Sequence, residues 1–217
     1  MIPVNIIARN NSLLNRFLKE IRDQKIQKDS MRFRRNLERI GEVMAYEISK
    51  TMTYHGVETQ TPLGIATCND IVEEPVLGCI LRAGLPLHQG MQNYFDKADN
   101  GFLSAFRKHT HKESFEIEIE YLACPSIDNR ILILADPMLA TGASMVLAHR
   151  AFLSHGTPKH IHVVSVIGSS EGVEYVRKHF PPNTTIWIGD VDDELTAQAY
   201  IVPGLGDAGD LAFGEKL

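Results

Sequence analysis

The sequence predicts an α/β protein built on a mainly parallel β-sheet. Val76 to Leu81 and Ile131 to Leu134 are apolar runs without alternation, which is typical of strands buried on both faces of such a sheet. His162 to Ile167 and Thr185 to Ile188 are further candidate strands, and helical patterns of about ten residues lie between the strands. Strands that alternate with helices favour parallel pairing through right-handed crossovers. At 217 residues, the chain is long enough to bury one sizeable core.

Composition and charge narrow the classes of function. The net charge of −5 gives no basic surface for binding nucleic acid by counterion release. Cys68, Cys79 and Cys124 are widely separated and odd in number, which argues against a disulfide framework or a structural zinc site. No apolar run approaches the ~20 residues of a membrane span, and the amino terminus lacks the plan of a signal peptide. We therefore expect a cytoplasmic protein with neither nucleic acid nor membrane as a partner.

The amino-terminal quarter of the chain is predicted to be helical. Apolar residues recur at threes and fours from Ser12 to Tyr54, with Ser12 available as an N-cap and a break near Asp29 and Ser30, so we expect two amphipathic helices. Three arginines in the second helix are predicted to form a solvated face: Arg32, Arg34 and Arg35. The segment from Glu58 to Ile71 has no clear period and is predicted to consist of extended connections.

The stretch from Ile131 to Ser144, ILILADPMLATGAS, is the centre of the predicted site. Pro137 ends the strand, and the small residues from Thr141 to Ser144 lead into a helical pattern from Met145 to Leu153. Unpaired N–H groups and the positive end of a helix dipole favour a phosphate at that corner. The carboxylate of Asp136 would repel a phosphate but can accept hydrogen bonds from sugar hydroxyls. A sugar phosphate satisfies both parts of the loop.

A second candidate anion site follows the strand that ends at Leu81. Arg82 offers a planar fork of donors, and Gly84 would let the backbone approach a ligand closely, before a helix that runs through Met91 and Tyr94. For an isolated Arg-Ala-Gly tripeptide, a surface salt bridge beside a turn would be the simpler interpretation.

Beyond this loop, we predict a projecting arm from Lys108 to Pro125. Phe102 to Phe106 is a short apolar strand, and apolar and acidic residues alternate from Phe115 to Tyr121, as in a half-exposed strand. A mobile arm with the basic run from Arg107 to Lys112 at its root can close over bound anions. Metal binding by the two histidines of that run is disfavoured, because no carboxylate-rich segment accompanies them.

The carboxyl-terminal segment from Tyr200 to Asp210, YIVPGLGDAGD, contains three glycines in six residues. A dinucleotide-binding fingerprint is rejected, because no strand–turn–helix unit of about thirty residues surrounds these glycines. A flexible tail is the simple structural alternative.

Three of these motifs together resemble one family. The stretch from Asp136 to Ser144 resembles the phosphoribosyl pyrophosphate (PRPP) loop of type I phosphoribosyltransferases, in the form found in uracil phosphoribosyltransferases. ILRAGLPL resembles the pyrophosphate-binding loop of that family, and YIVPGLGDAGD resembles its uracil-binding segment. Glycine-rich backbone can present both N–H and C=O groups to the edge of uracil. The resemblance extends from about Asn11 to Gly214 and includes the amino-terminal helices.

The resemblance implies the type I phosphoribosyltransferase fold: a parallel sheet flanked by helices, with a projecting β-arm and a hood formed by the two terminal segments. It implies one domain over residues 1–217, with a core of about 72–190 and a hood of about 1–71 and 191–217. The implied reaction transfers phosphoribosyl from PRPP to N1 of uracil and gives UMP and pyrophosphate. Mg²⁺ would be carried by PRPP, with no direct protein ligand. A GTP effector and a homo-oligomer, either a dimer or a tetramer, are further implications, although the sequence itself fixes neither.

The resemblance also assigns roles to residues. The implied catalytic residues are Asp136, Arg107 and Asp207. The implied PRPP-binding residues are Arg82, Ala83, Gly84, Arg107, Asp136, Pro137, Met138, Leu139, Ala140, Thr141, Gly142, Ala143, Ser144 and Asp207. The implied uracil-binding residues are Ile201, Gly206, Asp207 and Ala208.

Two departures and two alternatives accompany this assignment. Many relatives in the wider superfamily carry a second acid where this chain has Pro137, and several purine enzymes carry an acid in place of Ala140, so no general base is evident. The basic run from Lys108 to Lys112 replaces an acidic run that the family commonly has. A regulator with the same fold that binds RNA is the competing hypothesis, and the net charge of −5 argues against it. A uridine kinase is excluded by the absence of GxxxxGK[ST].

Overall fold

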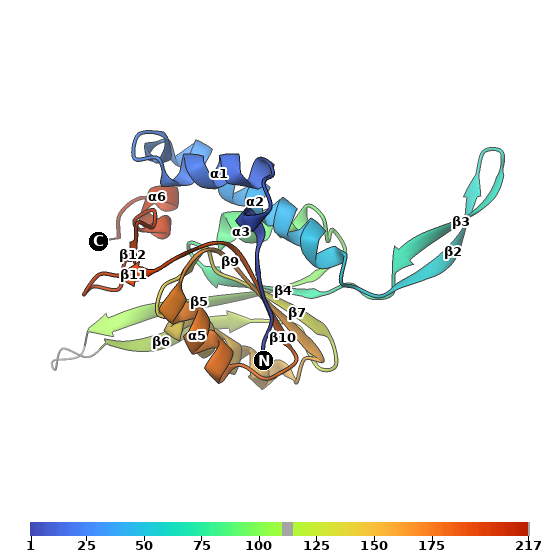
Figure 1. Ribbon diagram of the computed structural model, residues 1–217. Coiled ribbons are helices and arrows are strands. Elements are labelled where there is room, and N and C mark those ends of the chain that lie inside the picture. Colours follow the sequence, from blue (N-terminus) through green and yellow to red (C-terminus); the bar gives the residue numbers. More distant parts are fainter. Residues whose placement is uncertain (110–114, 217) are drawn as a thin grey trace.

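The computed structural model describes residues 1–109 and 115–216, and the side chains of residues 105–118 lie outside that description. Its central sheet has the order β1-β10-β9-β7-β4-β5-β6, with β8 paired to β9 (Figure 1). All neighbours are parallel except β5 and β6, which confirms the predicted mainly parallel sheet. The strands of this sheet are β1 Val4–Ile6, β4 Val76–Leu81, β5 Asp99–His109, β6 Phe115–Ala123, β7 Ile131–Ala135, β8 Met138–Leu139, β9 His160–Ser169 and β10 Thr184–Asp192.

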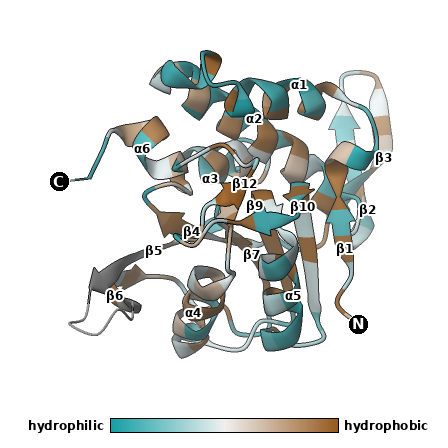
Figure 2. Ribbon diagram, turned by 60° about the vertical axis from the view of Figure 1, so that its left-hand side comes forward, coloured by the Kyte–Doolittle hydropathy of each residue, from teal (hydrophilic) through white to brown (hydrophobic). Residues whose placement is uncertain are grey.

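Helices cover both faces of the sheet (Figure 1). The first face carries α1 (Leu13–Arg22), α2 (Ser30–Ser49) and α3 (Leu85–Gln92), and the second carries α4 (Ala143–Phe152) and α5 (Ser170–His179). Strand β7 shows how the sequence produces this layering, because successive side chains alternate between the faces. Ile133 belongs to the core under α1 to α3, whereas Leu132 and Leu134 belong to the core under α4 and α5. Figure 2 shows apolar strands between these two helical layers.

The two predicted amino-terminal helices are present: α1 begins after the expected N-cap Ser12, and α2 begins at the expected break. The Ser12 hydroxyl caps α1 by accepting a hydrogen bond from the Leu14 N–H, and Asp29 caps α2. The assignment of all of residues 1–71 to the hood was too broad. Strand β1 pairs in parallel with β10 at Ile186 and so extends the central sheet.

A second correction concerns Glu58 to Ile71. This region belongs to an antiparallel hairpin of β2 (Tyr54–Thr61) and β3 (Gly64–Ile71), which projects from the rest of the molecule (Figure 1). The sequence shows no alternation here because the hairpin packs neither face against the core, so burial selects no period.

The predicted arm is formed by β5 and β6, which pair antiparallel with a register shift between Ser104 and Ala105. Strand β5 is longer than the expected Phe102 to Phe106. Residues 110–114, which include the second of the two histidines for which metal binding was disfavoured, His111, lie outside the described part of the chain.

The carboxyl-terminal segment contains the small strands β11 (Glu194–Leu195) and β12 (Ile201–Val202) and the short helix α6 (Ala208–Phe213). Helix α6 lies beside α2 and is held there by Arg34, whose Nη1 donates to the carbonyl oxygen of Ala212 at 2.6 Å. The interpretation of Arg34 as part of a solvated face was therefore wrong. Among the described residues, no helix is long and apolar enough to cross a membrane.

Candidate active site

A cavity of about 370 Å³ lies where β4 and β7 end, beneath the carboxyl-terminal segment. This is the edge at which ligands of open α/β sheets bind, and the volume is within the range of small-molecule sites. Residues from all three predicted motifs line the cavity: Arg82, Ala83, Asp136, Met138, Ala140, Ser144, Ile201, Gly206, Asp207 and Ala208. The fold therefore brings together segments that are more than one hundred residues apart in the chain.

Asp136 is fixed directly after β7, because its N–H donates to the carbonyl oxygen of Val164 at 3.1 Å. Asp136 lines the cavity and is partly exposed there. Burial raises the pKa of Asp136 to about 7, the charge of Asp207 adds to the rise, and a backbone hydrogen bond from Met138 opposes it. A carboxyl group that titrates near neutrality is typical of a functional site.

The corner between Asp136 and α4 is where the sequence predicts a phosphate. Gly142 has φ of +76° and is the N-cap residue of α4, and a Cβ there would lie 2.9 Å from the carbonyl oxygen of Gly172. The Ala143 N–H donates to the Thr141 hydroxyl at 3.4 Å, and Ser144 lines the cavity. Ser144 is thus the residue of this corner that reaches the cavity, whereas Thr141, Gly142 and Ala143 do not line it, and their predicted contact with PRPP stays a prediction.

Pro137 and Leu139 do not line the cavity. The Pro137 carbonyl oxygen accepts hydrogen bonds from the N–H groups of Val166 and Ile167, both at 3.0 Å, and Leu139 is buried in the core. These two residues fasten the loop to β9. Their predicted contribution to PRPP binding stays a prediction.

The second loop contacts the carboxyl-terminal segment. Nη2 of Arg82 donates to the Asp210 carboxylate at 3.2 Å and to the Gly214 carbonyl oxygen at 3.1 Å. A Cβ on Gly84 would lie 2.5 Å from the carbonyl oxygen of Ile80, so close packing of the loop against β4 requires a glycine. Gly84 does not line the cavity, and the packing accounts for it without a ligand.

Asp207 both caps a helix of the carboxyl-terminal segment and lines the cavity. One carboxylate oxygen caps α6 by accepting a hydrogen bond from the Asp210 N–H at 2.9 Å, and the side chain also lines the cavity. The backbone turns sharply just before it, with φ of +53° at Gly204 and +93° at Gly206. On either side of Gly204, Ile201 and Gly206 line the cavity, as do Asp207 and Ala208.

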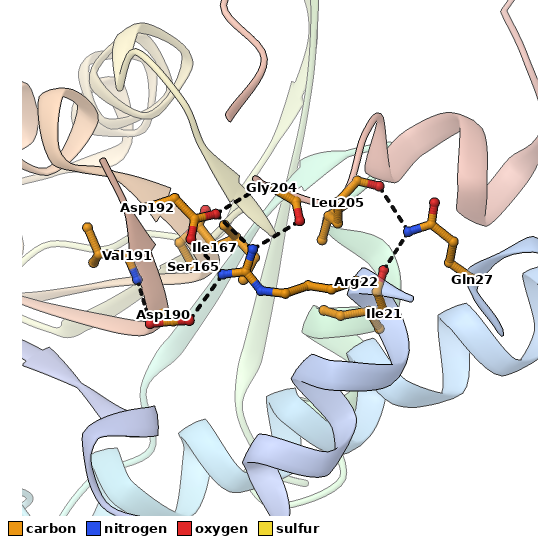
Figure 3. A network of polar contacts seen from close by, with 10 residues as sticks. All are labelled: Ile21, Arg22, Gln27, Ser165, Ile167, Asp190, Val191, Asp192, Gly204 and Leu205. Atoms are coloured by element: carbon orange, nitrogen blue, oxygen red, sulfur yellow. Dashed lines mark hydrogen bonds and ion pairs between the residues drawn. The ribbon is translucent and has the colours of Figure 1, made fainter. Parts of the chain in front are cut away.

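A partly buried polar network beside this turn was not predicted (Figure 3). Arg22 of α1 donates to both carboxylate oxygens of Asp192, at 2.8 and 2.9 Å, to Asp190 at 3.1 Å and to the Gly204 carbonyl oxygen at 2.9 Å. Gln27 donates to the carbonyl oxygens of Ile21 and Leu205. No local pattern marks these residues, because their partners lie about 170 to 180 positions away in the sequence.

The cavity also includes residues that the sequence motifs do not contain: Ile80, Leu81, Gln198, Ala199, Tyr200, Gly209 and Lys216. Lys216 adds a cation to the lining of a cavity that also contains Asp136 and Asp207, and a single lysine gives no sequence signal. Arg107 lies in β5 opposite Ile117, but its side chain is outside the described part of the chain. Its role therefore stays a prediction.

Within residues 1–109 and 115–216, no group of three or more histidine, cysteine or acidic side chains forms a metal site. Asp136 and Asp207 nevertheless supply carboxylate oxygens at the cavity, which is the ligand chemistry that Mg²⁺ prefers. The donor set therefore fits a magnesium ion that arrives with a substrate.

Comparisons with known proteins identify the family. The model of the family described as "Uracil phosphoribosyltransferase" matches residues 8–215. A uracil phosphoribosyltransferase of Porphyromonas gingivalis is 56% identical over 211 residues, which cover 97% of this chain and 98% of the relative. The chain belongs to the uracil phosphoribosyltransferase family. A uracil phosphoribosyltransferase of Methanothermobacter thermautotrophicus is 40% identical over 86% of this chain and 85% of the relative.

Solved structures share the fold of this chain. The structure of the AQ2163 protein from Aquifex aeolicus has a TM-score of 0.86 and 30% sequence identity, and the match covers 97% of this chain and 98% of that one. A hypoxanthine phosphoribosyltransferase from Staphylococcus aureus has a TM-score of 0.50 at 14% identity, over 85% of this chain and 83% of that one, and shows the fold alone. The predicted phosphoribosyltransferase fold is thereby confirmed.

Proposed function

We propose that this chain transfers the phosphoribosyl group of PRPP to N1 of uracil, giving UMP and pyrophosphate. The observation that carries the proposal is the single cavity lined by the Asp136 loop, the Arg82 loop and the carboxyl-terminal segment. Each part matches one piece of chemistry, since a helix amino terminus suits a phosphate, a carboxylate suits sugar hydroxyls, and fixed backbone groups suit a base edge.

Catalysis in this arrangement rests on positioning and electrostatics. Backbone N–H groups and hydroxyls from Thr141 to Ser144 hold the 5′-phosphate at the amino terminus of α4. Asp136 accepts hydrogen bonds from the ribose hydroxyls, and its negative charge stabilises the positive charge that develops on the sugar as pyrophosphate leaves. Because the carboxylate lies in a largely buried place, its attraction to that charge is screened less than in water.

The pyrophosphate end of PRPP is assigned to Arg82 and Arg107. Arg82 lines the cavity while its Nη2 bonds Asp210 and Gly214, so the loop and the carboxyl-terminal helix are joined at this point. Mg²⁺ bound to PRPP would neutralise part of the substrate charge, and Asp136 and Asp207 are carboxylates that line the same cavity. Its participation is tested by comparing rates in Mg²⁺ and in excess chelator.

The uracil edge is assigned to the backbone of Ile201, Gly206 and Ala208. Backbone groups cannot rotate as a hydroxyl does, so each position presents only a donor or only an acceptor. Uracil fits a fixed order of such groups, whereas cytosine reverses two of them.

A homo-oligomer, either a dimer or a tetramer, is part of this proposal, and the hairpin β2–β3 supports it. An isolated two-stranded hairpin is marginally stable in water. Here its turn exposes all of Leu63, and Ile65 is 68% exposed. Light scattering on the intact protein and on Ile65→Asp tests whether this surface is covered by another copy: a smaller assembly in the variant supports the proposal, and unchanged mass contradicts it.

Activation by GTP rests on the family resemblance and stays a prediction. A cytoplasmic location is supported by the three free cysteines and also stays a prediction. Rates with and without GTP test the first.

The decisive experiment incubates purified protein with PRPP, Mg²⁺ and one nucleobase at a time, and detects nucleoside monophosphates by chromatography. UMP formed from uracil, with stoichiometric pyrophosphate, supports the proposal. Absence of UMP together with the binding of pyrimidine-operon leader RNA would instead support the regulator.

A further inference from the structure

We infer that Arg22 and Asp192 are positioning residues for uracil, which hold the base-reading backbone through both peptide groups of Gly204. The inference rests on the proposed function and extends it to residues outside the cavity lining. Neither residue belongs to any of the three motifs, and Arg22 comes from the opposite end of the chain.

The contacts of Gly204 are the first argument. Its carbonyl oxygen accepts a hydrogen bond from Nη1 of Arg22 at 2.9 Å, and its N–H donates to Oδ2 of Asp192 at 2.9 Å (Figure 3). Arg22 and Asp192 also bind each other through two hydrogen bonds. The pair thus fixes the direction of both backbone groups of one residue, which side-chain packing alone cannot do.

The place of Gly204 in the segment is the second argument. It lies between Ile201 and Gly206, both of which line the cavity. Its φ of +53° makes the turn, and a Cβ at this position would lie 2.1 Å from the Ile201 carbonyl oxygen. A rotation of the Gly204 peptide groups would therefore also move the backbone of Ile201 and Gly206, which are assigned to the edge of uracil.

The environment of the pair is the third argument. The side chain of Asp192 is 7% exposed and that of Arg22 is 20% exposed, so water screens their interaction weakly. Burial lowers the pKa of Arg22, but the hydrogen bonds and negative charges of Asp192 and Asp190 have the larger combined effect, so the pKa of Arg22 is raised. Gln27 adds a second fixed point one residue further on, by donating to the Leu205 carbonyl oxygen at 3.1 Å.

A conservative substitution separates positioning from charge. Arg22→Lys keeps the positive charge beside Asp192, but an ammonium lacks the planar fork that serves two carboxylate oxygens and a carbonyl together. We expect the KM for uracil to rise about tenfold, as for the loss of one charge-assisted hydrogen bond, while the KM for PRPP stays within about twofold. The preference for uracil over cytosine in kcat/KM should fall by a similar factor.

Arg32→Lys is the matched control. Arg32 of α2 also donates two hydrogen bonds to one carboxylate, that of Glu20, and its side-chain hydrogen bonds in the described part of the chain do not reach the carboxyl-terminal segment. Both KM values should stay at the wild-type level in this variant, and its melting temperature reports the effect of losing a comparable ion pair.

Two results would overturn the inference. One is a wild-type KM for uracil in folded Arg22→Lys, and the other is an equal rise in the KM values for uracil and PRPP, which indicates general loosening of the fold. If Arg22→Lys does not fold, Gln27→Ala takes its place, with a several-fold rise in the uracil KM expected and an unchanged value contradicting the inference. Failure of the wild-type protein to form UMP is a separate outcome, which refutes the proposed function itself.

Discussion

The raised pKa of Asp136 predicts how the activity depends on pH. Burial and the charge of Asp207 disfavour the carboxylate, so the free protein holds a proton on Asp136 below a pH of about 7 and loses it above. The ionised form is the one that accepts hydrogen bonds from ribose and attracts a cationic sugar. At pH 6, about one tenth of the molecules carry that form, so kcat/KM for PRPP should fall about tenfold for each pH unit below 7.

The assay measures initial rates of UMP formation at limiting PRPP and saturating uracil, from pH 5.5 to 8.5. The phosphates of PRPP also titrate in this range, with the second proton of a phosphate monoester near pH 6, so the substrate contributes its own slope. Asp136→Asn has the same substrate contribution and no titrating carboxyl group at this position. The ratio of the two profiles therefore isolates Asp136, and in this ratio the inflection should lie near pH 7.

A second variant tests the physical cause of the shift. Asp207→Asn removes the like charge but keeps a side chain that caps α6 well. Because burial is the larger cause, the inflection should move to lower pH by less than about one unit, whatever happens to the maximal rate. If the wild-type and Asp136→Asn profiles have the same shape, the carboxylate has no part in the pH dependence and the reasoning fails.

Three other results are expected. Gly142→Ala should destabilise the protein by about 1–3 kcal/mol in chemical denaturation, because its φ is +76° and a Cβ meets a carbonyl oxygen of α5; an unchanged midpoint refutes this. His162 is buried and accepts a hydrogen bond from Trp187 at 2.9 Å, and burial and the neighbouring His160 lower its pKa to about 3. The contribution of neutral His162 to the free energy of unfolding is therefore complete above pH 6.5 and is lost as the pH falls toward 3. The free energy of unfolding should therefore depend on pH less steeply in His162→Asn, by up to about 1.4 kcal/mol per unit between pH 6 and 4, and parallel curves contradict the assignment. Arg107→Ala should raise the KM for PRPP and leave UMP affinity nearly unchanged in equilibrium binding, and equal loss of both shows a structural role.

The sequence predicts those parts of the fold in which burial leaves a local pattern. The strand from Ile131 to Ala135 is buried nearly throughout and is apolar throughout, so its place in a parallel sheet follows from its composition. Strand β1 is only three residues long and pairs with residues more than one hundred and eighty positions away, so local periodicity cannot reveal it. The hairpin β2–β3 was missed for a different reason, since the rest of the chain buries neither of its faces and burial therefore leaves no pattern in its sequence.

Among the residues of the candidate site, too, the sequence reveals those that lie in a local motif and does not reveal those whose partners are distant in the chain. Asp136 and Ser144 lie within one contiguous motif, and the fold places both of them on the cavity. Lys216 and Arg22 are single residues whose partners are distant in sequence, and only the folded chain shows what they contact. For Arg34, the charged neighbours suggested a solvated face, whereas the carbonyl oxygen of Ala212 supplies its partner.

The central claim is that the backbone from Ile201 to Ala208 reads uracil in the cavity that also holds PRPP. The most direct test is the ratio of kcat/KM for uracil to that for cytosine at saturating PRPP. Cytosine places two groups of the wrong polarity against fixed backbone partners, and each buried polar group left unpaired costs about 1–3 kcal/mol. A ratio of at least about one hundred is therefore expected. Comparable rates with the two bases would contradict the assignment of this segment to base recognition.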